Sequence, residues 1–373
     1  MPKKIIVSVI NELTSDQRVN RSCLTLQKAG FEVELIGRKY KKSLALKPRS
    51  YTCKRMHLLF KTGPLFYAEY NIRLFFLLLF KKSDVLFSND LDTLLPNYLV
   101  SLIKRQPLIY DSHELYTEVP ELIGRPLVKY IWTKIEAFIV PKLKFMITVN
   151  QSIADIFTDK YKINIAIIRN IPMPIPMENK PSKEELGYEK NDFLIILQGA
   201  GINIDRGAEE ALEAMKFVFD AKLLIIGSGD VFEKLKKKRI SFHLEDKVQI
   251  IDKLPYKELM KYTAIADLGL SLDKDTNLNY RYSLPNKVFD YIHAGIPVLV
   301  SQLPELMHLV DNYQIGACVR NINPQCIADR INAIKSNKQF LAEWRKNLVL
   351  AQKELNWELE KKKYLEFLGK VRG

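Results

Sequence analysis

The chain has 373 residues, which is long enough for two domains with separate hydrophobic cores. Its hydrophobic content of 47% and charged content of 27% are typical of a globular protein and exclude a disordered or fibrous one. Apolar runs stay far below the roughly 20 residues of a membrane-spanning helix. The 4 cysteines form no C-x-x-C pair, which argues against a zinc site or a disulfide framework. We therefore expect a cytoplasmic protein.

Positive charge is concentrated in the first half of the chain. The net charge is +14, and residues 1–180 carry 28 Lys and Arg against 16 Asp and Glu. The stretch from Arg38 to Lys61 contains nine basic residues and no acid. It suits a solvated surface, an anionic membrane surface on the inner face of the cell membrane, a phosphate-bearing acceptor or nucleic acid. No nucleic-acid-binding motif accompanies it, so we expect no nucleic-acid partner.

A strongly apolar helix is predicted directly after this basic stretch, over residues 64–80. It is either a buried helix of the domain or a helix that is partly inserted into a membrane interface.

Strands and helices alternate through residues 1–172, which we assign to a first domain. The predicted elements begin with a strand at residues 4–11, a helix at 16–29 and a strand at 31–37, and continue with strands at 84–88, 107–114 and 145–149. Short β-branched strands separated by helices are typical of a parallel sheet that is buried on both faces.

Polar residues follow two of these strands, at the sheet edge where α/β folds bind ligands. His113 lies at the end of the strand at residues 107–114, with Asp111 and Glu114 placed to orient its ring. Asp90 and Asp92 form a D-x-D pattern, which suits either a metal ion or Asx N-capping of a helix at residues 93–103.

A proline-rich segment separates the two halves. Four prolines fall within residues 171–183, and we assign residues 173–190 to an interdomain linker. The alternation resumes in a second domain at residues 191–350. Residues 222–230 form a strand that runs into a Gly-rich turn, and this segment lacks the dinucleotide fingerprint and the P-loop lysine, which argues against NAD and ATP.

The most informative stretch covers residues 283–300, SLPNKVFDYIHAGIPVLV. Its Leu-Pro-Asn turn opens a helix, and Gly295 ends that helix before a buried strand. Lys287 and Asp290 fall within about one turn of the helix start, near the positive end of its dipole. This arrangement predicts a site for a phosphorylated ligand at a helix N-terminus.

The pattern SLPNK-x-F-[DE]-Y-x-x-x-G-x-P-V in this stretch resembles the donor-sugar segment of retaining glycosyltransferases of the GT-B class, in particular family four, also called group one. The resemblance implies an α/β GT-B fold, in which two Rossmann-like parallel-sheet domains face a cleft. It also implies a C-terminal helix, here residues 351–373, that crosses back to the first domain. Asp290 matches the acidic residue that holds the donor ribose in that family, whereas Tyr282 stands where many members have a second Glu.

Other segments extend this resemblance to candidate site residues. Residues 200–206 resemble the G-R-x-x-x-x-K-G loop whose cations hold the donor diphosphate, with Arg206 in place of its lysine. Arg281 and Lys287 are the candidates for the second cation. The expected donor-binding residues are Gly199, Arg206, Gly227, Leu254, Ser283, Leu284, Pro285, Asn286, Lys287 and Asp290. The expected catalytic residues are His113, Arg206 and Lys287, and the acceptor-side candidates are Asn11, Asp16, Arg18, Glu114, Asn150 and Arg281.

The resemblance implies transfer of a hexose-type sugar from a nucleotide sugar, with retention of configuration, to a glycan or lipid-linked saccharide in cell-surface polysaccharide or glycolipid synthesis. Cationic side chains take the place of a metal, so neither a metal nor another cofactor is expected. Two alternatives stay open: another GT-B enzyme such as a nucleotide-sugar epimerase, and a non-catalytic subunit that binds a nucleotide sugar or a partner transferase.

Overall fold

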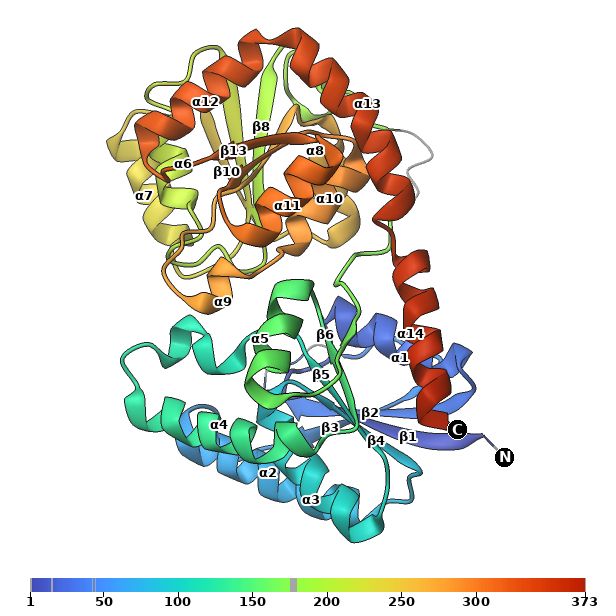
Figure 1. Cartoon of the computed structure of the whole chain (residues 1–373). Helices are drawn as coiled ribbons and strands as arrows, with labels where there is room; N and C mark the ends of the chain where they lie inside the picture. Colours follow the sequence, from blue (N-terminus) through green and yellow to red (C-terminus); the bar gives the residue numbers. More distant parts are fainter. Residues whose placement is uncertain (1, 15, 42, 44, 175–179, 373) are drawn as a thin grey trace. The chain divides into compact units, whose positions relative to one another are not determined.

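The computed structural model describes the chain except for residues 1, 15, 42, 44, 175–179 and 373 (Figure 1). The chain divides into two compact units, Met1–Asn170 together with Glu358–Gly373, and Ile171–Trp357. Residues 175–179 of the predicted linker lie outside the described residues. The described residues of this linker belong to the second unit, and they include a short 3-10 helix, Glu184–Leu186.

The first unit is built on a parallel sheet of seven strands in the order β3-β2-β1-β4-β5-β6-β7. The strands are β1 (Lys3–Ser8), β2 (Phe31–Lys39), β3 (Thr52–His57), β4 (Val85–Asn89), β5 (Leu108–Ser112), β6 (Phe145–Thr148) and β7 (Ala166–Ile167). The strand order reverses between β1 and β4, and open parallel sheets bind ligands beyond the carboxyl ends at such a point. Strand β3 was not predicted, because it is a mostly exposed edge strand without an apolar run.

Helices cover both faces of this sheet. They are α1 (Gln17–Lys28), α2 (Gly63–Phe80), α3 (Leu94–Lys104), α4 (Pro126–Ile139), α5 (Gln151–Tyr161) and α14 (Trp357–Arg372). The connections through α2, α3 and α4 cross the sheet in one direction, so right-handed crossovers place these three helices on one face. α2 packs against α3, and α3 packs against α4 (Figure 1). None of the described helices combines the length and the hydropathy that a membrane span requires.

The C-terminal helix α14 contributes to the core of the first unit. Glu360 is fully buried and accepts hydrogen bonds from the Arg169 backbone N–H at 2.8 Å and from its guanidinium at 2.9 Å. Tyr364 and Leu368 on the same helix are also fully buried.

The second unit contains a parallel sheet of six strands in the order β10-β9-β8-β11-β12-β13. The strands are β8 (Phe193–Gly199), β9 (Ala221–Gly227), β10 (Val248–Asp252), β11 (Leu268–Ser271), β12 (Val298–Ser301) and β13 (Gly316–Val319). Along β8, Ile195 and Leu197 enter one hydrophobic core, and Leu194 and Ile196 enter another. The sheet is therefore buried on both faces, and the prediction of two Rossmann-like parallel-sheet domains is confirmed.

The helices of the second unit differ in places from the prediction. They are α6 (Ala208–Ala214), α7 (Phe232–Ser241), α8 (Tyr256–Ile265), α9 (Leu278–Arg281), α10 (Asn286–Ala294), α11 (Pro304–Tyr313), α12 (Pro324–Ser336) and α13 (Lys338–Glu354). The sequence pattern predicts a longer helix than α6, over residues 207–219, and it predicts a loop over residues 273–282, where α9 lies. The sequence also predicts one helical segment over residues 324–367, but the structure interrupts it twice, at Asn337 and between α13 and α14. The Asn337 side chain caps α13 by accepting the Phe340 N–H at 3.0 Å.

Candidate functional site

Two glycines hold the loops at the carboxyl ends of β8 and β9 against each other. Gly227 has a φ of 154°, and a Cβ there would lie 1.8 Å from the Gly199 carbonyl oxygen, so only glycine fits. Beyond the strands, the Ile202 N–H donates to the Ser228 carbonyl oxygen at 2.8 Å. These contacts fix the start of the segment that carries Arg206.

A third glycine positions Arg206. Gly207 has a φ of 74°, and a Cβ there would lie 2.2 Å from the Leu272 carbonyl oxygen. This close approach places Arg206 beside Asp273, the residue after Leu272. Arg206 Nη1 donates to Asp273 Oδ1 at 2.8 Å, and the guanidinium lies 4.0 Å from the centre of the Tyr280 ring.

Asp273 connects the two predicted cations. Lys287 Nζ lies 3.8 Å from Asp273 Oδ2, on the same carboxylate that binds Arg206. Burial alone would raise the pKa of Asp273, but the charges of Lys287 and Arg206 hold it below its usual value. Burial lowers the pKa of Lys287, and Asp273 opposes this shift. The three side chains, here called the Arg206–Asp273–Lys287 triad, carry one more positive than negative charge.

The start of α10 lies next to this triad. Lys287 is in the first turn, and the N-cap residue Pro285 has no side-chain acceptor for the helix N–H groups. The Ser283 hydroxyl bonds back to the preceding turn at 3.0 Å, Leu284 packs against the adjacent core, and Asn286 is exposed. The helix N–H groups, the helix dipole and the two cations together favour an anion at this position.

Asp290 lies one turn further along α10 and is buried. Its carboxylate accepts hydrogen bonds from the Tyr256 hydroxyl at 2.6 Å and from the Gln198 amide at 3.0 Å. Gln198 is itself fixed, since its amide oxygen accepts from the Thr263 hydroxyl at 2.6 Å. Leu254 is partly buried against the same core, two residues before Tyr256. These contacts set the orientation of a carboxylate that can accept more than two hydrogen bonds.

In the first unit, His113 lies after β5 between two carboxylates. Its Nδ1 is 3.1 Å from Asp90 Oδ2, and its Nε2 is 3.2 Å from Asp111 Oδ2. Arg18 Nη2 donates to Asp111 Oδ1 at 2.6 Å. Burial opposes the charged form of His113, but Asp90 and Asp111 raise its pKa to about 10. Burial would raise the pKa of Asp111, but Arg18 and His113 lower it to about 2. His113 is therefore an imidazolium at neutral pH and not a general base.

The two acids of the D-x-D pattern have different surroundings. Asp90 contacts His113, whereas Asp92 is buried, and its Oδ1 accepts no hydrogen bond from the described residues. Burial raises the pKa of Asp92, and the charge of Asp90 adds to this shift. The predicted Asx N-capping is wrong, because the N-cap of α3 is Thr93, without a side-chain cap bond. Within the described ranges, no three His, Cys, Asp or Glu side chains are grouped so that they could hold a metal ion.

Three of the acceptor-side candidates make local backbone contacts. Asn11 bonds to the Asp16 carboxylate and accepts the Leu13 N–H at 2.9 Å, and Asp16 N-caps α1 by accepting the Val19 N–H at 2.9 Å. Asn150 caps α5 in the same way, accepting the Ile153 N–H at 2.9 Å. Short polar side chains before a helix are common caps, so these positions have a structural explanation.

The remaining candidates lie in separate surroundings. Arg281 donates to the Asp275 carboxylate at 2.8 Å, on an exposed part of the second unit. Glu114 is half-buried directly after His113, and its carbonyl oxygen accepts from the Ser112 hydroxyl at 2.9 Å.

The basic stretch from Arg38 to Lys61 is not a uniform surface. The Arg38 guanidinium lies 4.3 Å from the centre of the Tyr40 ring and 4.5 Å from that of Phe66, and burial lowers its pKa. Arg49 donates to a tyrosine hydroxyl at 2.8 Å. Lys42 lies outside the described residues.

Two family models match the chain. Residues 18–178 match Glycosyltransferase Family 4, and residues 180–349 match Glycosyl transferases group 1. The chain belongs to the group 1 glycosyltransferases. No curated protein sequence matches this glycosyltransferase significantly.

Solved structures share the GT-B fold of this glycosyltransferase. Sucrose-phosphate synthase from Thermosynechococcus elongatus has a TM-score of 0.79 at 15% identity, with 99% of both chains covered. HepE from Anabaena, in complex with UDP-glucose, has a TM-score of 0.74 at 14% identity, covering 99% of this chain and 100% of that one. WaaG, a glycosyltransferase involved in lipopolysaccharide biosynthesis, has a TM-score of 0.69 at 14% identity, covering 97% of this chain and 98% of that one.

Several contact residues of this glycosyltransferase were not predicted. Asp273 stands two residues after β11. Its position as an acidic residue just beyond the carboxyl end of a strand is the sequence feature that could have identified it as a site residue. Asp90 was considered only as a metal ligand or a cap. Gln198 carried no signal, because its role depends on the distant Asp290.

Proposed function

We propose that this glycosyltransferase moves a hexose-type sugar from a nucleotide sugar to a glycan or lipid-linked saccharide, with retention of anomeric configuration and without a metal ion. The observation that carries the proposal is the Arg206–Asp273–Lys287 triad beside the start of α10. HepE, which shares the fold, holds UDP-glucose in its solved structure, which supports a nucleotide sugar as the donor.

The triad suits the leaving group of such a transfer. As the bond to the sugar breaks, negative charge accumulates on the nucleoside diphosphate, and fixed positive groups stabilise it. Arg206 can donate two parallel hydrogen bonds to a phosphate, and Lys287 adds a compact charge. Asp273 holds both cations before the donor arrives, so little reorganisation is needed during the reaction. In this proposal, both cations contact the diphosphate.

Asp290 is proposed to bind the ribose hydroxyls of the donor. Tyr256 and Gln198 orient its carboxylate, and the residue stands on the same helix as Lys287. A ribose and a diphosphate of one nucleotide would thus be held by successive turns of α10.

His113 is proposed to stabilise the transferred sugar through the positive charge of its ring, because both ring nitrogens face carboxylates. Its raised pKa of about 10 keeps the ring protonated at neutral pH, so it has no lone pair with which to deprotonate an acceptor hydroxyl. The positive charge of the first half of the chain supports an anionic or membrane-associated acceptor in cell-surface polysaccharide or glycolipid synthesis.

A donor panel followed by a transfer assay tests the proposal. Thermal shifts with UDP-, GDP- and dTDP-sugars identify the nucleotide, and released nucleoside diphosphate and product configuration are then measured with and without EDTA. We expect one nucleotide class to stabilise the protein, turnover that EDTA leaves unchanged, and a product with the anomeric configuration of the donor.

Variants of the triad connect the assay to the structure. Arg206→Ala and Lys287→Ala each remove a charged contact of about 1.5–3 kcal/mol, so turnover should fall at least about tenfold. Lys234→Ala on α7 is the control, because Lys234 is exposed and bonded to Glu209. Failure of every sugar nucleotide to bind would overturn the proposal. Binding without turnover would favour a non-catalytic subunit, and an epimerised nucleotide sugar would favour an epimerase.

A further inference from the structure

The outward sides of α2, α3 and α4 in the first unit expose many large apolar side chains. These residues, here called the apolar helix face, are Leu65, Ile72, Phe76 and Phe80 of α2, Leu99, Leu102 and Ile103 of α3, and Leu127, Tyr130, Ile131 and Phe138 of α4. Their spacing puts the members on each helix in one stripe, and α2 buries Phe66, Tyr70, Leu74 and Leu78 on its other side. Monomeric proteins rarely gather so many exposed apolar residues in one place.

Direct contacts hold the three helices side by side. Lys104 of α3 donates to the Leu78 carbonyl oxygen of α2 at 2.7 Å. The rings of Tyr98 on α3 and Phe138 on α4 are 6.2 Å apart. Because the helices also share one face of the sheet, their exposed stripes belong to a single layer of the unit (Figure 1).

The charges on this layer are almost all positive. α3 contains no acid, and the acids of α2 and α4 are Glu69, which pairs with Arg73, and Glu136, which is buried and pairs with Lys160. Basic residues gather at the C-terminal ends of the helices and in the loops that follow: Lys81, Lys82, Lys104, Arg105, Lys142 and Lys144. The one acid in these loops, Asp84, accepts the Lys4 N–H at 2.6 Å.

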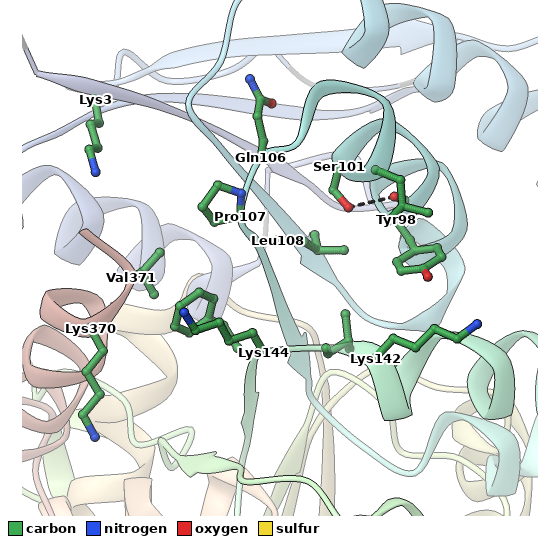
Figure 2. Close-up of a pocket in the computed structure, with 13 residues that line it drawn as sticks. Lys3, Tyr98, Ser101, Gln106, Pro107, Leu108, Lys142, Lys144, Lys370 and Val371 are labelled. Carbon is green, nitrogen blue, oxygen red and sulfur yellow. Dashed lines mark hydrogen bonds between the residues drawn. The ribbon is translucent and has the colours of Figure 1, made fainter. Parts of the chain in front are cut away.

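A cavity of about 380 Å³ opens at the same end of the first unit (Figure 2). Lys3, Lys142, Lys144 and Lys370 line it, and its lining contains no acidic side chain. Leu102 belongs both to this cavity and to the apolar helix face. The cavity therefore joins the apolar layer to a site with an excess of positive charge.

We propose that the apolar helix face, with this lysine-lined cavity at its edge, docks onto a bilayer that contains anionic phospholipid. Apolar side chains enter the boundary between headgroups and acyl chains, while the lysines approach lipid phosphates. A second copy of the chain fits poorly, because a symmetric contact would bring two sets of lysines together without acids to pair with them. The inference goes beyond sugar transfer and does not depend on it.

Vesicle co-sedimentation of the full chain tests the proposal. The vesicles consist of phosphatidylcholine alone or of phosphatidylcholine with about 30% phosphatidylglycerol, a charge density similar to that of anionic leaflets. We expect binding to the anionic vesicles only, and weaker binding at high salt because salt screens the lysines. Equal binding to both compositions, or to neither, would overturn the proposal.

Paired variants locate the surface. Lys142→Gln with Lys144→Gln should weaken binding about 25-fold, because each lysine near an anionic surface contributes about fivefold. Phe76→Ser with Phe80→Ser should weaken it at least about tenfold through lost apolar burial. The matched control is Leu350→Ser with Lys353→Gln on α13 of the second unit, where Leu350 is exposed, and it should bind as the wild type does.

Two further measurements distinguish the bilayer from a soluble anion and from a second copy of the chain as the partner of this surface. All variants should keep the wild-type unfolding temperature, and Phe76→Ser alone replaces the pair if the pair unfolds early. Binding of glycerol phosphate without binding of vesicles would mean a soluble anion site and would overturn docking. A dimer in light scattering that Phe76→Ser abolishes would assign the surface to a second copy instead.

Discussion

At the residue scale, the charge balance around Asp273 decides how the cations of the second unit are held. One buried carboxylate compensates two partly buried cations, Arg206 and Lys287. Breaking a buried ionic contact by removing one partner is costly, because the remaining charges are left without compensation. Asp273 is therefore as much a part of the candidate site as the cations that were predicted from the sequence.

This balance makes Asp273→Asn strongly destabilising. Arg206 and Lys287 would then repel each other beside a buried, uncharged amide, so the free energy of unfolding should fall by about 3 kcal/mol. Urea denaturation measures the change. The control is Asp275→Asn, whose exposed pair with Arg281 should contribute less than about 1 kcal/mol. Equal effects of the two variants would contradict the assignment.

The raised pKa of His113 predicts a dependence of stability on pH. The folded protein binds the His113 proton with a pKa of about 10, whereas an unfolded chain binds it near 6.5. The stabilisation is therefore complete below about pH 6.5 and is lost as the pH rises toward 10. Asp111 has the corresponding effect at acidic pH. Its lowered pKa stabilises the fold above about pH 4, and this contribution is lost as the pH falls toward 2.

Urea denaturation between about pH 7 and 10 tests the His113 contribution. Wild-type stability should fall by about 1–3 kcal/mol more than that of His113→Gln over this range. His57→Gln on β3 is the control, because His57 is exposed, and its pH dependence should follow the wild type. If the stability of the wild type and of His113→Gln falls in parallel over this pH range, the pKa of His113 is not raised in the folded protein.

At the scale of elements, tight crossings of backbone segments position the site. Gly207 and Gly187 both have a left-handed φ, 74° and 86°, but only Gly207 lies against another segment. Gly207→Ala should therefore lower the free energy of unfolding by about 1–2 kcal/mol through backbone strain, and by a further amount because the new Cβ displaces Leu272. It should also slow turnover, because Arg206 moves with its neighbour. Gly187→Ala should show the strain alone. Similar losses of stability and activity in both variants would argue against the close approach.

An element could be predicted from the sequence when the features that define it lie within its own residues. α10 was predicted with its start, its stop and its two charged residues, because all of them are local features of residues 283–300. β3 and α9 were missed, since an exposed edge strand and a helix of 4 residues have little periodicity. Asn150 shows a third case: a short polar residue before a helix fits both a binding site and an N-cap, and the cap is what the structure contains.

At the scale of the whole molecule, the alternation of strands and helices was sufficient to predict two parallel-sheet domains. The contacts between distant parts of the chain were not predictable in the same way. The Asp273 contacts join residues 67 and 14 positions apart, and Glu360 contacts Arg169 across 191 positions. No local pattern indicates such pairs, which the folded backbone alone brings together.

The last helix gives the clearest test at this scale, because the second unit separates it in sequence from the rest of the first unit. In α14, Glu360 is fully buried and bonded to Arg169, and Leu368 is completely enclosed. Leu368→Ala should lower the stability of the first unit by about 2–5 kcal/mol by leaving a cavity. Deleting residues 358–373 should also leave Arg169 without its carboxylate and prevent the first unit from folding stably.

Limited proteolysis with thermal unfolding measures these effects. We expect rapid cleavage within residues 2–170 in the deletion variant and persistence of a fragment that contains the second unit, whose two cores include no residue of α14. Glu366→Ala on the exposed side of α14 is the control and should change the stability by no more than about 0.5 kcal/mol. Protection of residues 2–170 in the absence of α14 would show that the first unit is complete without this helix.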